Sequence, residues 1–120
     1  MVRVVGIDHL VIGQGGAFTL DAKNVDAVMV GGAATDYLPK AVLESRRASR
    51  LLAKASSRSV GVRPVLIVTG AAISDRMRPS DITILRLGEL LPWFRRQPPV
   101  LSDETVSALV RAAHDPATWQ

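Results

Sequence analysis

Cysteine is absent from this 120-residue chain, and histidine is rare. Without cysteine the chain can form no disulfide, no thiolate zinc site and no thiol nucleophile. Its two histidines, His9 and His114, are too far apart in sequence to suggest a zinc site. Chemistry in this chain must therefore depend on carboxylates, hydroxyls and basic side chains.

Aromatic residues and long apolar runs are also scarce. Aromatics make up 4% of the sequence, so a core has to be built from Val, Leu, Ile and Ala within a 48% hydrophobic content that is typical of a globular chain. No apolar run approaches the roughly 20 residues of a membrane span, and no signal peptide is visible. We therefore expect one cytoplasmic domain over residues 1–120 with no membrane partner. The net charge of +4 is compatible with an anionic partner such as nucleic acid.

The hydrophobic pattern predicts an α/β fold, a mixed β-sheet with helices packed on it. Apolar runs bounded by turn residues indicate strands, whereas apolar residues at three- and four-residue spacing indicate helices. Ser102 is expected to cap the last helix, and Trp119 to fold back on the core. The predicted strands are 3–13, 16–23, 27–30, 65–69 and 82–85, and the predicted helices are 40–55, 87–96 and 103–114.

The most informative feature is a hairpin signal near the N-terminus. The runs 3–13 and 16–23 flank the sequence Gly-Gln-Gly-Gly at positions 13–16. These glycines could be mistaken for a phosphate loop, but the Lys-Ser/Thr and the helix that follow such a loop are missing. A tight turn is the stronger interpretation.

The hairpin register brings acidic residues together. If positions 14 and 15 form the turn, Gly13 pairs with Gly16, and Asp8 then lies opposite Asp21 on the same face. Lys23 shares that face because it lies two residues farther along the strand. His9 would point to the other face, as a packed histidine rather than a ligand.

Two carboxylates and a lysine on one face are suited to metal-dependent phosphodiester hydrolysis. Mg²⁺ or Mn²⁺ takes oxygen ligands, and the bound ion polarises a phosphate and activates water. Asp8 and Asp21 are the candidate metal ligands, and Lys23 the residue that assists catalysis. The alternative is a solvent-facing Asp8 with Asp21 and Lys23 as a surface ion pair.

These residues resemble a known family. Residues 6–13 (Gly-Ile-Asp-His-Leu-Val-Ile-Gly) and 15–24 (Gly-Gly-Ala-Phe-Thr-Leu-Asp-Ala-Lys-Asn) are similar to the nuclease-related domain (NERD) family, especially its actinobacterial members. The resemblance implies a restriction-endonuclease-like, PD-(D/E)xK fold. It also implies that Asp8 is the first acidic ligand, Asp21 the (D/E) residue and Lys23 the catalytic lysine. The similarity continues through residues 28–32, 45–52, 91–96 and 98–101.

The chain departs from the family at its start. Relatives usually carry an N-terminal helix with a glutamate before the first core strand, whereas Met1 directly precedes that strand here. We therefore expect this helix to be missing and the acidic site to be incomplete. The alternatives are a catalytically inactive module that binds nucleic acid or a protein, and a homo-oligomer in which a second copy covers the uncovered flank.

Basic residues also recur along the helix predicted for residues 40–55. Arg46, Arg50 and Lys54 follow one another at four-residue intervals, with Arg47 beside them. Such a face could contact a phosphate backbone. The alternative is a solvated helix face. The four residues are the predicted nucleic-acid-binding residues.

Overall fold

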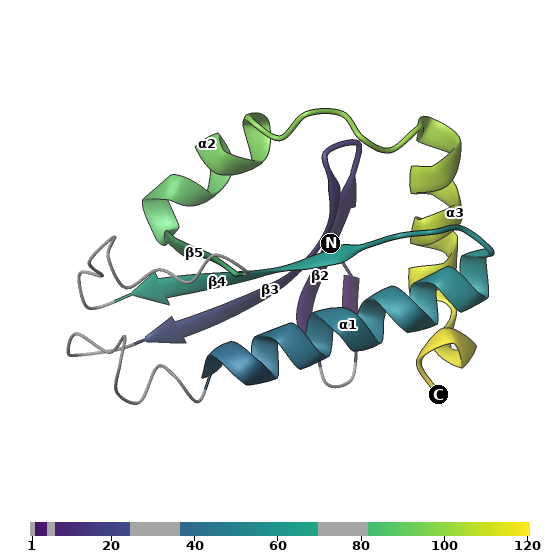
Figure 1. Ribbon diagram of the computed structural model, residues 1–120, viewed down its shortest axis with the longest axis horizontal. Coiled ribbons are helices and arrows are strands. Elements are labelled where there is room, and N and C mark those ends of the chain that lie inside the picture. The colour runs from purple at the N-terminus through teal and green to yellow at the C-terminus, as the bar shows by residue number, and fades with distance from the viewer. Residues whose placement is uncertain (1, 5–6, 25–36, 70–81) are drawn as a thin grey trace.

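A computed structural model describes residues 2–4, 7–24, 37–69 and 82–120. Strands and helices follow one another in a mixed order (Figure 1). The elements are β1 (Val2–Val4), β2 (Ile7–Gly13), β3 (Gly16–Asn24), α1 (Tyr37–Ser56), β4 (Val62–Thr69), β5 (Thr83–Arg86), a 3-10 turn (Leu87–Glu89), α2 (Leu90–Arg95), α3 (Asp103–His114) and a second 3-10 turn (Pro116–Trp119).

The strands form one five-stranded sheet in the order β1-β2-β3-β4-β5. The pairs β1–β2 and β2–β3 are antiparallel, whereas β3–β4 and β4–β5 are parallel. Because neighbouring parallel strands need a crossover, α1 carries the chain from the end of β3 back to the start of β4. The predicted α/β class with a mixed sheet is confirmed.

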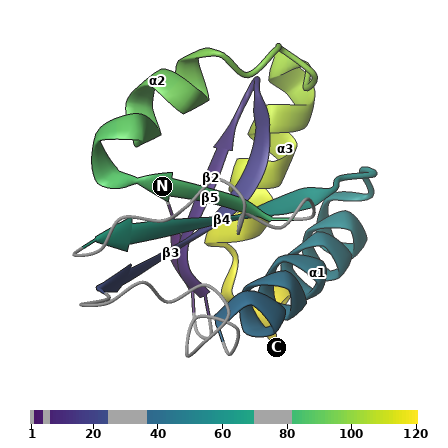
Figure 2. The same ribbon diagram turned by 60° about the vertical axis from the view of Figure 1, so that its left-hand side comes forward.

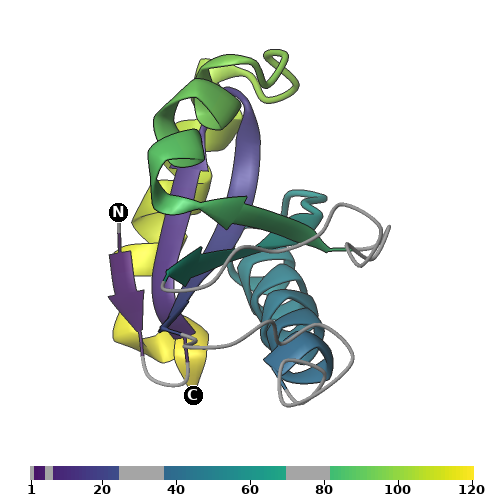
Figure 3. The same ribbon diagram turned by 90° about the vertical axis from the view of Figure 1, so that its left-hand side faces the viewer.

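Helices cover both faces of this sheet (Figures 2 and 3). On one face, Leu10 and Ala17 of the hairpin pack with Leu52 of α1 and Leu109 of α3. On the other face, Phe18 and the β4 residues Val65 and Ile67 pack with α2. Side chains that alternate along β3 therefore enter two different cores, as expected of a strand buried on both sides.

The aromatic residues of α2 belong to the second core. The ring centroids of Trp93 and Phe94 lie 5.3 and 5.2 Å from that of Phe18, in edge contacts. Arg95 and Arg96 are exposed. This segment thus combines buried aromatic packing with an exposed arginine pair.

The hairpin has the predicted register. Gly13 pairs with Gly16, and the ladder continues without a bulge to His9 opposite Leu20. Gly16 has a φ of 131°, a conformation that L side chains rarely adopt, which explains the glycine at this position. The first arm differs from the prediction, because residues 3–13 are divided between β1 and β2, which pair with each other.

Helix α1 begins earlier than predicted, at Tyr37 rather than Lys40. Pro39 lies in its first turn, where backbone N–H groups have no intrahelical acceptor, so proline is tolerated there. Ala41, Ala48 and Leu52 are buried and form its apolar face, whereas Ala55, in the last turn of the helix, is exposed.

Strand β4 also begins earlier than predicted, at Val62 rather than Val65, and it contains Pro64. Pro64 pairs with Thr19 of β3, but β5 pairs only with residues 65–68. Among the described strands, Pro64 therefore has a neighbour in β3 only, and a missing N–H is tolerated at such an edge position.

The C-terminal segment follows the prediction. The backbone N–H of Thr105 donates to the Ser102 hydroxyl at 3.1 Å, which caps α3. Trp119 packs against the first core, and its indole nitrogen donates to the Ala113 carbonyl. The strand predicted for residues 27–30 lies outside the described residues.

Candidate functional site

Asp21 lies in the middle of the sheet, close to the carboxyl end of β3. It is 6% exposed, and its register partner on the parallel strand β4 is Leu66. Since β3, β4 and β5 run in the same direction, their carboxyl ends meet at one edge of the sheet. Figure 1 shows the beginning of α1 near this same edge. Open α/β sheets typically bind ligands at the carboxyl edge of their parallel strands.

The other two residues of the predicted triad lie nearby in the backbone. Asp8 is the residue before His9, whose partner is Leu20, so one further step of the ladder would set Asp8 opposite Asp21. Lys23 is in β3 and pairs with Val68. The side chains of Asp8 and Lys23 lie outside the described residues, and their convergence on Asp21 stays a prediction.

Two buried hydroxyls on the α1 side of the sheet escaped the sequence argument. Thr19 lies two residues before Asp21 on β3 and is 4% exposed. Ser45 of α1 is 3% exposed, and its hydroxyl donates to the Val42 carbonyl at 2.8 Å. The sequence pattern could have identified both. Thr19 lies two residues from Asp21 and so shares its sheet face, and Ser45 lies on the same helical face as Ala41 and Ala48. Asp21 thus shares its side of the sheet with buried polar groups.

The two candidate carboxylates at this edge, Asp8 and Asp21, suit a hard cation, but they offer few ligand atoms. Carboxylate oxygens are the ligands that Mg²⁺ and Mn²⁺ prefer. Within the described part of the chain, no group of three or more Asp, Glu, His or Cys side chains could hold a metal ion. An ion bound by Asp8 and Asp21 would therefore depend on water and substrate oxygens for its remaining ligands, as Mg²⁺ often does.

The predicted basic residues of α1 have different environments. Arg46, Arg50 and Lys54 are exposed, and the eight helical steps from Arg46 to Lys54 span about 12 Å. Arg47 is half-buried, and its guanidinium donates to the Trp119 carbonyl at 3.1 Å. We call Arg46, Arg50 and Lys54 the basic stripe. Arg47 therefore differs from the basic stripe, because it is hydrogen-bonded to the C-terminal segment.

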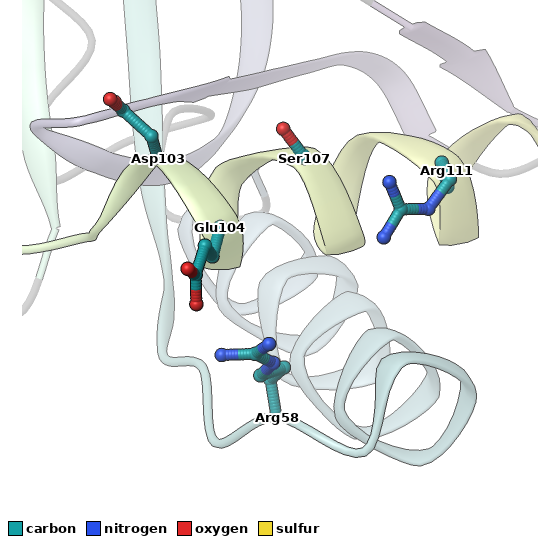
Figure 4. Close-up of a pocket in the computed structure, with 5 residues that line it drawn as sticks. All are labelled: Arg58, Asp103, Glu104, Ser107 and Arg111. Carbon is teal, nitrogen blue, oxygen red and sulfur yellow. The ribbon is translucent and has the colours of Figure 1, made fainter.

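A pocket of about 370 Å³ lies away from the predicted triad, between the start of α3 and the turn that follows α1 (Figure 4). Asp103 accepts a hydrogen bond from the Gln14 amide at 2.6 Å, and Arg58 donates to Thr105 at 3.2 Å. These contacts tie α3 to the hairpin and to the turn after α1. The pocket is lined by Arg58, Asp103, Glu104, Ser107 and Arg111, none of which was predicted as a site residue.

No family model, curated protein or solved structure matches this chain. In residues 2–4, 7–24, 37–69 and 82–120, no helix has both the length and the apolar character needed to cross a membrane.

Proposed function

We propose that this chain is a metal-dependent, nuclease-like domain that hydrolyses phosphodiester bonds in nucleic acid, with DNA as the expected substrate. The proposal assigns it to the NERD family, with a restriction-endonuclease-like version of the α/β fold. The observation that carries it is the hairpin register, which runs from Gly13–Gly16 to His9–Leu20; one further step of the same ladder would set Asp8 opposite Asp21. The buried position of Asp21 near the carboxyl edge of the sheet adds support.

In this proposal each residue has a separate role. The carboxylates of Asp8 and Asp21 would hold Mg²⁺ or Mn²⁺, which supplies phosphate polarisation and an activated water when bound. The Lys23 ammonium would stabilise the negative charge that develops on the phosphate oxygens. Burial of Asp21 strengthens its interaction with a cation, because the surroundings screen charge less than water does.

Calorimetric titration with Mg²⁺ and with Mn²⁺ tests the carboxylate pair. We expect binding to the wild-type chain and none to the Asp8→Ala/Asp21→Ala variant. Glu104→Ala is the matched control, because it removes an exposed carboxylate from the start of α3 and should leave metal binding unchanged. Absence of binding to the wild-type chain at millimolar metal would contradict the metal-dependent assignment.

Cleavage of a labelled DNA duplex tests the reaction itself. Asp21→Ala should abolish metal-dependent cleavage, and Asp21→Asn should do the same while keeping the size of the side chain, because a neutral amide binds a divalent cation weakly. Thermal unfolding of both variants shows whether they retain the fold. A folded Asp21→Asn variant that cleaves as fast as the wild-type chain would refute the role of Asp21.

The basic stripe favours a second candidate, a catalytically inactive NERD-like module that binds nucleic acid without metal. Each phosphate contact contributes about 0.9 to the slope of log K against log salt on duplex DNA. Reversing the charge at Arg46, Arg50 and Lys54 should therefore lower that slope by about 2.7 or more. The same change at Arg111, an exposed arginine of α3, is the matched control. Unchanged binding in the triple variant would exclude the stripe as the binding surface.

A further inference from the structure

Arg86 is the last residue of β5 and lies in the same register row as Lys23. Lys23 of β3 pairs with Val68 of β4, and Val68 pairs in turn with Arg86. Partners in neighbouring parallel strands share a sheet face, so Lys23 and Arg86 occupy the two ends of one row on the α1 side. Because strands lie about 4.8 Å apart, the two Cα atoms are separated by roughly 10 Å.

This row differs from the preceding row on the same face of the sheet. There Asp21 pairs with Leu66, and Leu66 with Ile84, so the acidic position is followed by two buried apolar residues. In the Lys23 row only the central residue, Val68, is apolar and buried, at 5% exposure. Two basic residues therefore flank a buried valine, two residues closer to the carboxyl edge than Asp21.

The local structure holds the Arg86 backbone in place but leaves its side chain at the surface. The Arg86 N–H donates to the Glu89 carboxylate at 2.9 Å, which fixes the end of β5 against the following 3-10 turn. The Arg86 side chain is exposed. A guanidinium on a fixed backbone is well suited to bind phosphate, because its planar fork can donate two hydrogen bonds to one anion.

Arg63 is also exposed and lies on a strand, but it has a different environment. Its guanidinium carbon lies 5.5 Å from the Phe18 ring centroid and 5.6 Å from that of Trp93, and Nη1 donates to Gln97 at 3.3 Å. Arg63 thus stabilises the aromatic core on the α2 side of the sheet. Arg86 lies at the opposite end of the parallel strands, near the candidate site.

We infer that Arg86 binds a backbone phosphate of the nucleic acid other than the phosphate at Lys23. The roughly 10 Å between the two Cα atoms exceeds the 3.4 Å axial rise between successive phosphates of one strand, so the row can reach more than one phosphate. The inference depends on the proposed function, because it extends the same substrate along the same sheet edge. It makes Arg86 a binding residue that determines how long a substrate must be.

Fluorescence anisotropy of a labelled 16-base-pair duplex, measured without metal at several salt concentrations, tests this contact. Arg86→Ala should lower the slope of log K against log salt by about 0.9, and Arg86→Lys should restore most of it. Arg111→Ala, which removes an exposed arginine from α3, should leave the slope unchanged. Thermal unfolding of each variant confirms that the fold is retained.

Neutral methylphosphonate linkages then locate the contact along the strand. Moved step by step away from the cleaved bond, one such linkage should at one position weaken wild-type binding and leave Arg86→Ala binding unchanged. A salt slope in Arg86→Ala equal to that of Arg111→Ala would overturn the inference while leaving the proposed function intact. A wild-type chain that binds neither metal nor duplex would overturn both.

Discussion

The two ends of the β2–β3 hairpin differ in what their residues do. At the tip, the Gln14 carbonyl accepts hydrogen bonds from the N–H groups of Val100 and Leu101 at 2.8 and 3.0 Å, and the Gln14 amide donates to Asp103. At the base, Asp21 and Lys23 lie in rows that continue across the parallel strands. The tip thus holds the segment before α3 in place, whereas the base carries the candidate chemistry. The glycine-rich segment is thus a tight turn that contacts the segment before α3.

The core next to the tip should be the most sensitive to substitution. Leu109 of α3 is fully buried and packs with Leu10 and Leu52. Leu109→Ala leaves a cavity and should lower the free energy of unfolding by about 2–5 kcal/mol in urea denaturation. Leu91→Ala, at a leucine that is 62% exposed, should change it by no more than about 0.5 kcal/mol.

Titration of Leu109→Ala and Leu91→Ala with Mg²⁺ tests whether the two ends of the hairpin are independent. If the base is an independent site, Leu109→Ala should bind Mg²⁺ as the wild-type chain does wherever it remains folded. A loss of metal affinity in folded Leu109→Ala would show that the two ends are coupled through the sheet.

The turn at the tip should give a smaller but specific effect. A Cβ added at Gly15 would lie 2.9 Å from the Gln97 Cβ, closer than real Cβ atoms approach one another. Gly15→Ala should therefore lower the free energy of unfolding by about 1–3 kcal/mol. Gln97→Gly removes the opposing atom, so the double variant should lose less than the sum of the two single losses. Additive losses would show that the Gln97 Cβ is not what makes Gly15→Ala destabilising.

Local sequence signals predicted much of this fold. The glycines at 13–16 and the alternation along both arms determined the hairpin register, and Ser102 identified the start of α3. These features depend on residues close together in the chain. The division of the first arm into β1 and β2 could not be predicted in this way, because it depends on how Val2 pairs with Leu10.

The candidate site was predictable to the same extent. Alternation along β3 placed Asp21 and Lys23 on one side, but it did not identify Arg86, which joins the Lys23 row only through two parallel pairings. Arg46 and Arg47 were both predicted to bind nucleic acid. They differ in the structure because the chain returns to α1 72 residues later, at Trp119.

This difference between Arg46 and Arg47 leads to the smallest predicted effects. Arg47→Ala removes the hydrogen bond to the Trp119 carbonyl and should lower the free energy of unfolding by about 1 kcal/mol. Arg46→Ala removes an exposed side chain and should change stability by no more than about 0.5 kcal/mol. If the basic stripe contacts phosphate, Arg46→Ala should lower the slope of log K against log salt for duplex binding by about 0.9, the contribution of one phosphate contact.

Urea denaturation and duplex anisotropy on both variants separate these roles. The expected pattern is reciprocal, because stability falls in Arg47→Ala and the salt slope falls in Arg46→Ala. Equal effects on both quantities would show that α1 has one continuous basic surface. Arg47 would then contact nucleic acid as well as Trp119, and the C-terminal turn would adjoin the binding face.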